Sequence, residues 1–194
     1  MEQTRLRILF LANVPSPYRV EFFNVLGREC DLTVLYQLHS SAERDKKWTA
    51  QADTCYAQVY LKGRATSVDK ALCPGVIPWL QKDWDAIVIS GNTSPTELLA
   101  IAWCKLRGIP YCLEADGAFP GSGRGLKELI KAQAVRGAAM YLSTCRELDK
   151  YYLHYGAEAQ RIRRYRFSSL GEADILPRCP SREEKNAIRG ELGI

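Results

Sequence analysis

The sequence has no hydrophobic run long enough to cross a membrane. Its 194 residues begin with a polar stretch, 1–7, followed by the apolar run 8–12. That run is too short for the core of a signal peptide. A spanning helix needs about 20 consecutive apolar residues, and no segment approaches that length. Any membrane contact is therefore expected to be peripheral.

Histidine is scarce, and cysteine pairs at metal-binding spacing are absent. The two histidines, His39 and His154, lie far apart, and the seven cysteines include no C-x-x-C pair. We therefore expect no metal site. Cys30, Cys104 and Cys112 fall in apolar runs, where a thiol behaves as a small hydrophobe. An odd number of such thiols indicates a reduced, cytoplasmic protein.

The common nucleotide and nucleophile fingerprints are missing as well. The sequence contains no G-x-G-x-x-G turn, no Walker loop and no G-x-S-x-G. The net charge of +5 is too small to require a nucleic-acid partner. Arginines in the stretch 161–166 alternate with Ile162 and Tyr165. This pattern favours a solvated strand, or a surface facing an adjacent domain, over an oligonucleotide site.

Short apolar runs alternate with segments of helical periodicity along most of the chain. Strands separated by helices indicate a parallel sheet covered on both faces. The predicted fold is therefore α/β, a Rossmann-like doubly wound parallel sheet. Its strands are expected at 8–12, 32–36, 56–61, 87–91, 111–114, 140–144 and 162–167, and its helices at 18–28, 74–82, 95–107, 125–137 and 147–155.

The tail is organised differently. Residues 172–180 are irregular and contain prolines, as a linker does, and Ser181 to Glu184 form a capping box that opens a helix through Leu192. We predict a Rossmann-like domain over 1–171, and a linker with an inter-domain helix over 172–194. Two interpretations of that helix stay open: it marks a domain boundary, or it packs back on its own sheet.

Functional residues are expected at the carboxyl ends of the strands, where open parallel sheets bind ligands. The first turn there, 13–19, contains Pro15 and Pro17 and presents Tyr18 and Arg19. Arg19 can pair bidentately with a phosphate or a carboxylate. The residues alone favour a plainer interpretation, a surface arginine beside a tyrosine packed on the sheet.

A second turn contains Gly91, which lets a ligand or another backbone approach closely. The exposed amides after Ser94 can take an anion. Mutual capping of Ser94 and Glu97 is the favoured interpretation for those two residues, whereas both interpretations of Gly91 stay open.

The third turn carries the most chemistry. Glu114 and Asp116 end a strand, and a loop with glycines at 117, 121, 123 and 125 follows. Such a loop is flexible enough to act as a lid. A strand-end carboxylate is suited to act as a general base or to anchor an acceptor hydroxyl. For Asp116 this stands beside the alternative of a turn carboxylate on a surface loop, and for Glu114 the latter is favoured.

Several segments together resemble bacterial retaining glycosyltransferases of family 4. The opening stretch 7–19, continuing through Phe22, Phe23, Asn24 and Leu26, is similar to the proline-rich start of that group. The strand end Glu114-Ala115-Asp116-Gly117 is similar to its carboxylate-bearing turn. The pair Tyr155-Gly156 followed by Arg161-Ile162, and the helix 181–194, resemble segments near its domain end.

The resemblance implies a GT-B fold, in which two Rossmann-like domains face each other across a cleft. This chain would be the amino-terminal, acceptor-side domain, and the donor-binding domain would be absent, so the chain alone is expected to be inactive. The reaction would transfer a hexose from UDP or GDP to a saccharide or lipid-linked acceptor with retention, needing neither metal nor cofactor.

The resemblance also implies residue roles. Asp116 would approach the reacting sugar, and the cleft would be lined by Asn13, Tyr18, Arg19, Gly91, Glu114 and Gly117. Many relatives have a histidine where this chain has Asp116. Two other classes stay open: a nucleotide-binding Rossmann module of another enzyme, such as an oxidoreductase, and a non-catalytic interaction domain.

Overall fold

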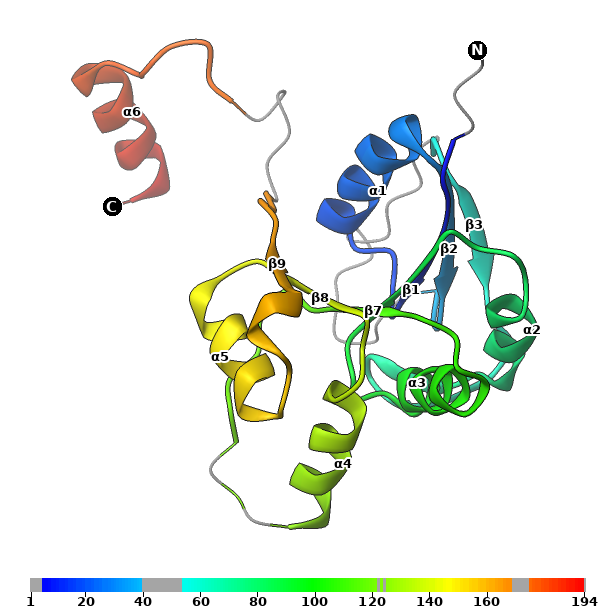
Figure 1. The fold of residues 1–194 in the computed structure, drawn as a ribbon. Helices are drawn as coiled ribbons and strands as arrows, with labels where there is room; N and C mark the ends of the chain where they lie inside the picture. Colours follow the sequence, from blue (N-terminus) through cyan, green and yellow to red (C-terminus); the bar gives the residue numbers. More distant parts are fainter. Residues whose placement is uncertain (1–4, 40–53, 122, 124, 169–174, 194) are drawn as a thin grey trace.

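The structure is a computed structural model that describes residues 5–39, 54–121, 123, 125–168 and 175–193. Strands and helices alternate along it (Figure 1). The strands are β1 (Arg7–Ala12), β2 (Asp31–Tyr36), β3 (Ala57–Tyr60), β4 (Arg64–Ser67), β5 (Lys70–Leu72), β6 (Ala86–Ser90), β7 (Cys112–Glu114), β8 (Met140–Ser143) and β9 (Ile162–Arg164). The helices are α1 (Pro17–Glu29), α2 (Ile77–Leu80), α3 (Pro95–Arg107), α4 (Leu126–Val135), α5 (Arg146–His154) and α6 (Arg182–Leu192).

Seven of the described strands form one sheet in the order β3-β2-β1-β6-β7-β8-β9. Every neighbouring pair in it is parallel. Phe10 of β1, for example, lies opposite Val34 of β2 on one side and Val88 of β6 on the other. The predicted doubly wound, Rossmann-like sheet is therefore confirmed, and the carboxyl ends of its strands share one rim.

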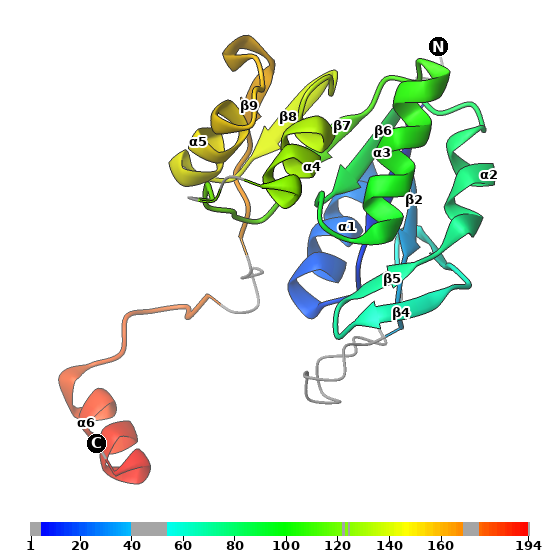
Figure 2. The ribbon, with the colours of Figure 1, turned by 90° about the horizontal axis from the view of Figure 1, so that it is seen from below.

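Both faces of the sheet are covered, which explains why the strands are continuously apolar. On one face α1 brings Phe23 against Phe10, Val34 and Tyr36. On the other face the larger part of the core lies beneath α2 to α5. Figure 1 shows α1 above the strands and α2, α3 and α4 below them. Seen from below in Figure 2, α3 and α4 lie in front of the sheet.

The start of α3 follows the predicted capping box. Ser94 is the N-cap, and the Glu97 carboxylate accepts from the backbone N–H of Ser94 at 2.9 Å. The Ser94 hydroxyl also donates to the carbonyl of Ala71 at 3.1 Å. Ala71 belongs to the β4–β5 hairpin, a separate antiparallel pair that the sequence analysis missed because its strands are only three and four residues long.

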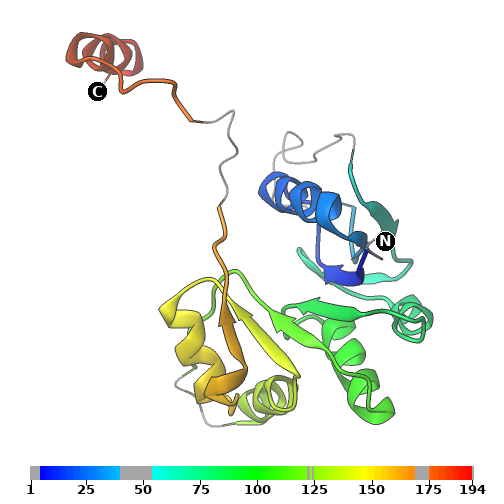
Figure 3. The same cartoon turned by 45° about the horizontal axis from the view of Figure 1, so that its top comes forward.

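In the carboxyl-terminal part the last strand is shorter than predicted, whereas the helix is present as predicted. The last strand of the sheet, predicted over 162–167, ends at Arg164. The predicted helix forms, with its capping box of Ser181 and Glu184, but every residue of α6 is exposed. Figure 3 shows α6 standing apart from the sheet, so it does not pack back on its own domain. No helix within the described ranges combines the length and apolarity that a membrane span requires.

Candidate functional site at the carboxyl rim of the sheet

Arg19 is the centre of a charged cluster at the carboxyl rim. Pro17 opens α1, and its fixed backbone angle suits a first helical position, which places Arg19 in the first turn. The side chain lies across the rim and is only 6% exposed. Its Nη2 donates to both oxygens of Glu114, at 3.0 and 2.9 Å, and to Ser90 Oγ at 3.1 Å. The same nitrogen lies 2.5 Å from Asp116 Oδ1.

Glu114, the last residue of β7, is buried, and each of its two carboxylate oxygens accepts two hydrogen bonds. Besides Arg19, it accepts from Ser90 Oγ at 2.6 Å and from the Tyr165 hydroxyl at 2.6 Å. Burial and the neighbouring Glu114 raise the pKa of Tyr165, so its hydroxyl stays protonated as a donor. All the partners of Glu114 come from its own protein, which leaves this carboxylate no capacity for a ligand.

Asp116 differs because its side chain is 40% exposed. Its Oδ2 accepts from the Tyr18 hydroxyl at 3.3 Å, and its carbonyl accepts from Thr144 Oγ1 at 2.9 Å. Burial, together with the charge of Glu114, raises the pKa of Asp116, although Arg19 and Tyr18 oppose that shift. The result is an oriented carboxyl group that faces outward and binds a proton more readily than an ordinary aspartate.

The charges in the cluster do not balance. One guanidinium faces two carboxyl groups, and its Nη1 is buried without a hydrogen-bond partner among the described residues. Burial opposes the charged form of Arg19, but Glu114 and Asp116 more than offset it, so the pKa of Arg19 lies above its ordinary value. The cluster therefore carries an excess negative charge, which sits on its only half-exposed carboxyl group, Asp116.

Aromatic rings enclose one side of the cluster. The ring centroid of Phe167 lies 5.3 Å from the Arg19 guanidinium and 5.8 Å from the Tyr18 ring. Phe22 lies 5.7 Å from Phe167 and 6.0 Å from Tyr165. These rings are half-buried, so they shield Arg19 on one side while still facing solvent in part.

The neighbouring turn at Gly91 is closed by the protein itself. Gly91 has φ +104°, and a Cβ added there would lie 2.8 Å from Glu97 Oε2. The Glu97 carboxylate also accepts from the N–H of Thr93 at 2.8 Å and from Gln37 Nε2 at 3.1 Å. Glu97 thus occupies the N–H groups of Thr93 and Ser94 immediately before α3. The favoured interpretation of Ser94 and Glu97, mutual capping, is confirmed.

Asn13 and Gly117 stand apart from the charged cluster. The Asn13 side chain holds its own turn, with Oδ1 accepting from the N–H of Val14 at 2.8 Å. Gly117 is exposed, and open space surrounds the position of an added Cβ. Of the glycine-rich loop that follows, Ser122 and Arg124 lie outside the described residues, so a lid function stays a prediction.

Two interpretations favoured from the residues alone are wrong. Arg19 is not a surface arginine, and Glu114 is not a turn carboxylate on a surface loop, since both are buried and paired with each other. The physical reason is their separation: they lie 95 positions apart in the chain, and only the parallel sheet brings β7 near the turn after β1. Asp116, in contrast, lies where a cleft carboxylate was expected.

Three contributors were missed by sequence reasoning: Ser90, Tyr165 and Phe167. A strand-end serine such as Ser90 has no distinguishing pattern. The available signal for Tyr165 was its alternation with arginines, which indicated that it and the arginines point to opposite faces. Phe167 was assigned to a strand, whereas it follows β9 and turns back over Arg19.

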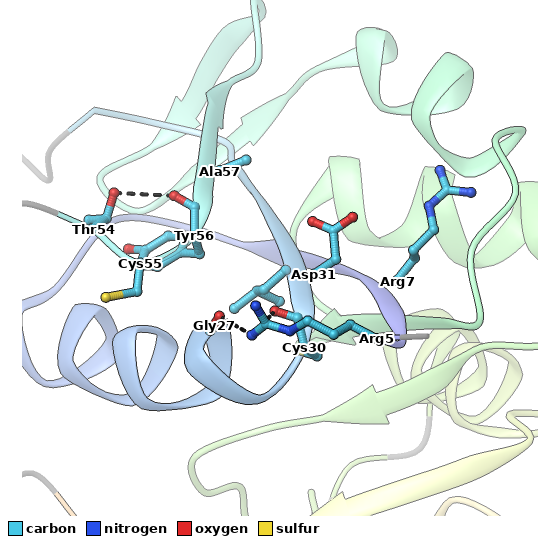
Figure 4. A pocket seen from close by; sticks show the side chains of 10 residues that line it. Arg5, Arg7, Gly27, Cys30, Asp31, Thr54, Cys55, Tyr56 and Ala57 are labelled. Atoms are coloured by element: carbon cyan, nitrogen blue, oxygen red, sulfur yellow. Dashed lines mark hydrogen bonds between the residues drawn. The ribbon is translucent and has the colours of Figure 1, made fainter. Parts of the chain in front are cut away.

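A hollow of about 750 Å³ opens at the end of the sheet opposite the charged cluster. Figure 4 shows Arg5 extending toward Gly27 at the end of α1, while Arg7 points away. Arg5 Nη2 donates to the carbonyls of Gly27 at 3.0 Å and Cys30 at 3.3 Å, so it caps the helix. Because Arg5 is engaged by the chain, and ligands of open α/β sheets bind at the carboxyl rim, we do not assign function here.

Comparison with known proteins supports the fold. No protein-family profile matches the sequence, and no curated protein matches it significantly. Among solved structures, Anabaena HepE in complex with UDP is similar with a TM-score of 0.61 and 13% identity, over 97% of this chain and 50% of that one. Its complex with UDP-glucose gives a TM-score of 0.59 and 12% identity, with the same coverage.

A further similar structure is UDP-GlcNAc 2-epimerase from Methanocaldococcus jannaschii, with a TM-score of 0.52 and 14% identity over 80% of this chain and 44% of that one. These neighbours have the GT-B fold, so this chain has the architecture of one GT-B-like, Rossmann-like domain. The chain spans about half the length of the HepE chain it matches.

Proposed function

We propose that this chain is the acceptor-side half of a retaining glycosyltransferase of the family 4 type. It would present a saccharide or lipid-linked acceptor hydroxyl to a hexose carried by UDP or GDP. The observation that carries the proposal is the Asp116 carboxyl group, half-exposed at the rim and oriented by Arg19 and Tyr18. The similarity to proteins solved with UDP and UDP-glucose supports a nucleotide sugar as the donor.

The chemistry of Asp116 suits an acceptor alcohol. A carboxylate accepts the hydrogen bond of a sugar hydroxyl, and one whose pKa is raised is the stronger base for its proton. Arg19 fixes the direction of the carboxylate without competing for the acceptor, because it is buried under Phe167. The half-buried rings of Tyr18 and Phe167 offer an apolar surface for the sugar ring, as ligand sites generally combine apolar walls with few polar groups.

The rim is better suited to the acceptor than to the donor diphosphate. Among the described residues at the rim, Arg19 is held by Glu114 and Asp116, and the N–H groups of Thr93 and Ser94 are held by Glu97. These donors are therefore already engaged by carboxylates of this chain. We therefore assign donor binding to a second domain, as in the family that the sequence resembles. Retention of configuration is carried over from the same resemblance, and no metal or cofactor is invoked.

We place peripheral membrane contact at an apolar groove of about 390 Å³ between α3 and α4. Leu126 and Leu129 line it and are 74% and 63% exposed. Exposed Lys127 lies beside them, while Glu128 is turned inward onto Tyr155. An apolar face flanked by cations fits an anionic lipid surface. The groove is lined by Leu98, Ile101, Ala102, Lys105, Leu126, Leu129, Ile130, Gln133 and Ala134.

Cosedimentation with phosphatidylglycerol vesicles tests this placement. We expect Leu129→Ser to reduce vesicle binding by about threefold or more, since burying a leucine side chain contributes roughly 1.5–3 kcal/mol. Leu106→Ser is the control, because Leu106 is 78% exposed on α3 but does not line the groove. Equal sedimentation of both variants and the wild type would place membrane contact elsewhere.

Sugar transfer tests the function. Transfer from labelled UDP- and GDP-hexoses should be measured with this chain alone, which we expect to be inactive, and with this chain joined to a donor-binding domain. In the active form, Asp116→Asn should reduce kcat about 10²–10⁴-fold, the usual contribution of a general base. Asp83→Asn, with its side chain fully exposed, is the charge-matched control.

The outcomes separate the alternatives. Undiminished transfer by Asp116→Asn would remove Asp116 from the mechanism. Stabilisation of the chain by NAD(P), with no transfer, would favour a nucleotide-binding module of another enzyme. Failure of every nucleotide sugar and saccharide to bind would favour a non-catalytic interaction domain.

A further inference from the structure

Tyr165 and Phe167 contact the charged cluster from a segment that leaves the sheet after β9. We propose that these two side chains are positioning residues, which hold Glu114 and Arg19 in place and thereby set the orientation and burial of Asp116. The consequence for acceptor binding rests on the proposed function, whereas the positioning itself does not.

The hydrogen bond of Tyr165 carries the first half of the argument. The Tyr165 backbone N–H donates to the Ser143 carbonyl at 3.0 Å, which extends the ladder between β8 and β9 by one residue. Its hydroxyl then reaches Glu114 Oε1 at 2.6 Å. The other donors to Glu114, Ser90 and Arg19, come from β6 and α1, so Tyr165 is what ties this carboxylate to the segment after β9.

Phe167 carries the second half. Its ring lies over the Arg19 guanidinium at 5.3 Å and meets the Tyr18 ring edge-on at 5.8 Å. Arg19 and Tyr18 are the two side chains that hold the carboxyl group of Asp116. A displacement of Phe167 would therefore let water reach both groups and loosen Asp116 without touching it.

Tyr165 and Phe167 follow β9, so under this proposal they connect the position of Asp116 to the segment that leaves the sheet. The segment that contains Tyr165 and Phe167 continues toward α6, which stands clear of the sheet (Figure 3). The orientation of Asp116 thus depends on how the chain leaves the domain. Under this proposal, any element that displaces the segment after β9 would change the acceptor site through Glu114 and Arg19.

The chain offers a matched control between the two residues. Arg166 is exposed, and within the described residues no hydrogen bond or ion pair involves its side chain. Arg166→Ala therefore alters the same segment without altering the cluster. Phe167→Tyr keeps the ring and serves as the conservative replacement for Phe167→Ala.

The first measurement is a carbon-13 NMR titration of the Asp116 carboxyl group in the 194-residue chain. The charged and titratable groups around it are Arg19 and Tyr18 from α1, Glu114 from β7 and Tyr165 after β9. Since burial is the main reason that the pKa of Asp116 is raised, Phe167→Ala should lower it toward the ordinary value. Phe167→Tyr and Arg166→Ala should leave it unchanged. The same pKa in Phe167→Ala and Arg166→Ala would overturn the proposal.

Amide hydrogen exchange tests the role of Tyr165. In Tyr165→Phe, exchange should rise about tenfold at 16–20 and 112–116 and stay unchanged in α3 and α5, because the loss of one hydrogen bond to a charged group weakens the cluster locally. A uniform rise over the whole domain would mean that Tyr165 only contributes to global stability, and would contradict positioning.

A kinetic readout connects positioning to function. In the active enzyme, Phe167→Ala should raise the KM for the acceptor about tenfold with a smaller change in the KM for the donor, since misplaced groups lose orientation. Were the NMR shift to occur with no effect on acceptor KM, the positioning would stand and the proposed acceptor role of Asp116 would fail. Were neither to occur, positioning itself would be wrong.

Discussion

Two buried glutamates lie at the same rim of the sheet and differ in what neutralises them. Glu97 faces dipoles: it accepts from the N–H groups of Thr93 and Ser94 and from the Gln37 amide. Glu114 faces charge, because Arg19 lies across both of its oxygens and also contacts Asp116. Burial raises the pKa of Glu97, while its donors oppose that shift.

The comparison separates a carboxylate that caps a helix from a cluster that is a candidate functional site. The bonds of Glu97 hold the N–H groups of Thr93 and Ser94 at the start of α3, so this carboxylate is committed to the fold. The cluster around Glu114 has one carboxyl group too many, and the surplus, Asp116, is oriented and partly exposed. Uncompensated charge at a half-exposed position is typical of a functional site.

The largest expected effect comes from removing the positive charge of Arg19, which neutralises Glu114. Arg19→Met should destabilise the chain by about 3–5 kcal/mol, because it leaves Glu114 buried beside Asp116 without a cation. Urea unfolding followed by circular dichroism measures this. Arg28→Met, on an exposed residue of the same helix, should change the stability by less than about 0.5 kcal/mol.

A double variant sharpens that result. Arg19→Met with Glu114→Gln should be more stable than Arg19→Met alone, since it removes the stranded buried charge along with its partner. If Arg19→Met costs no more than Arg28→Met, the buried ion pair does not contribute as proposed.

The next effect tests the Glu97 side. Alanine in the left-handed region costs about 1–2 kcal/mol, which applies to Gly108→Ala at φ +64°, and Gly91→Ala at φ +104° lies further from the φ that alanine tolerates. At Gly91 the new Cβ would also lie 2.8 Å from Glu97 Oε2, whereas nothing lies within 4 Å of it at Gly108. Gly91→Ala should therefore have the lower midpoint in thermal unfolding. Equal midpoints would show that Glu97 adjusts at no cost.

The smallest effect has the opposite sign. The pKa of Asp116 is higher in the folded chain than in the unfolded one, so the folded state holds a proton that the unfolded state has released. The stability that this proton contributes is lost as the pH rises from the ordinary aspartate value, about 3.9, through the raised one. Asp116→Asn cannot ionise and should be slightly more stable than the wild type at neutral pH.

Melting temperatures between pH 4 and pH 8 check this prediction. The curves of Asp116→Asn and the wild type should converge at low pH and separate as the pH rises. Asp83→Asn should follow the wild type throughout, because Asp83 is fully exposed. A constant gap at every pH would mean that ionisation of Asp116 is not the cause. A more stable but less active variant is the usual outcome at a functional site.

The local sequence pattern was enough to predict the capping box of Glu97 but not the pairing of Glu114 with Arg19. The capping box of Ser94 and Glu97 spans four residues, and the chemistry of a helix start dictates it. The strand end at Asp116 was also predictable, because a carboxylate follows an apolar run. The pairing of Arg19 with Glu114 was not predictable, because a single sequence does not show which residues far apart in the chain come into contact.

By itself, the sequence determined the alternation of apolar strands and helices, hence the parallel sheet and the rim where its turns gather. Because the burial of apolar surface follows from local periodicity, short segments of the sequence are enough to predict these features. Only the tertiary structure decided which polar side chains share that rim. It buried Arg19 between Glu114 and Asp116 and turned Phe167 over them, because a charged side chain is stable inside a protein only where the fold supplies its partner.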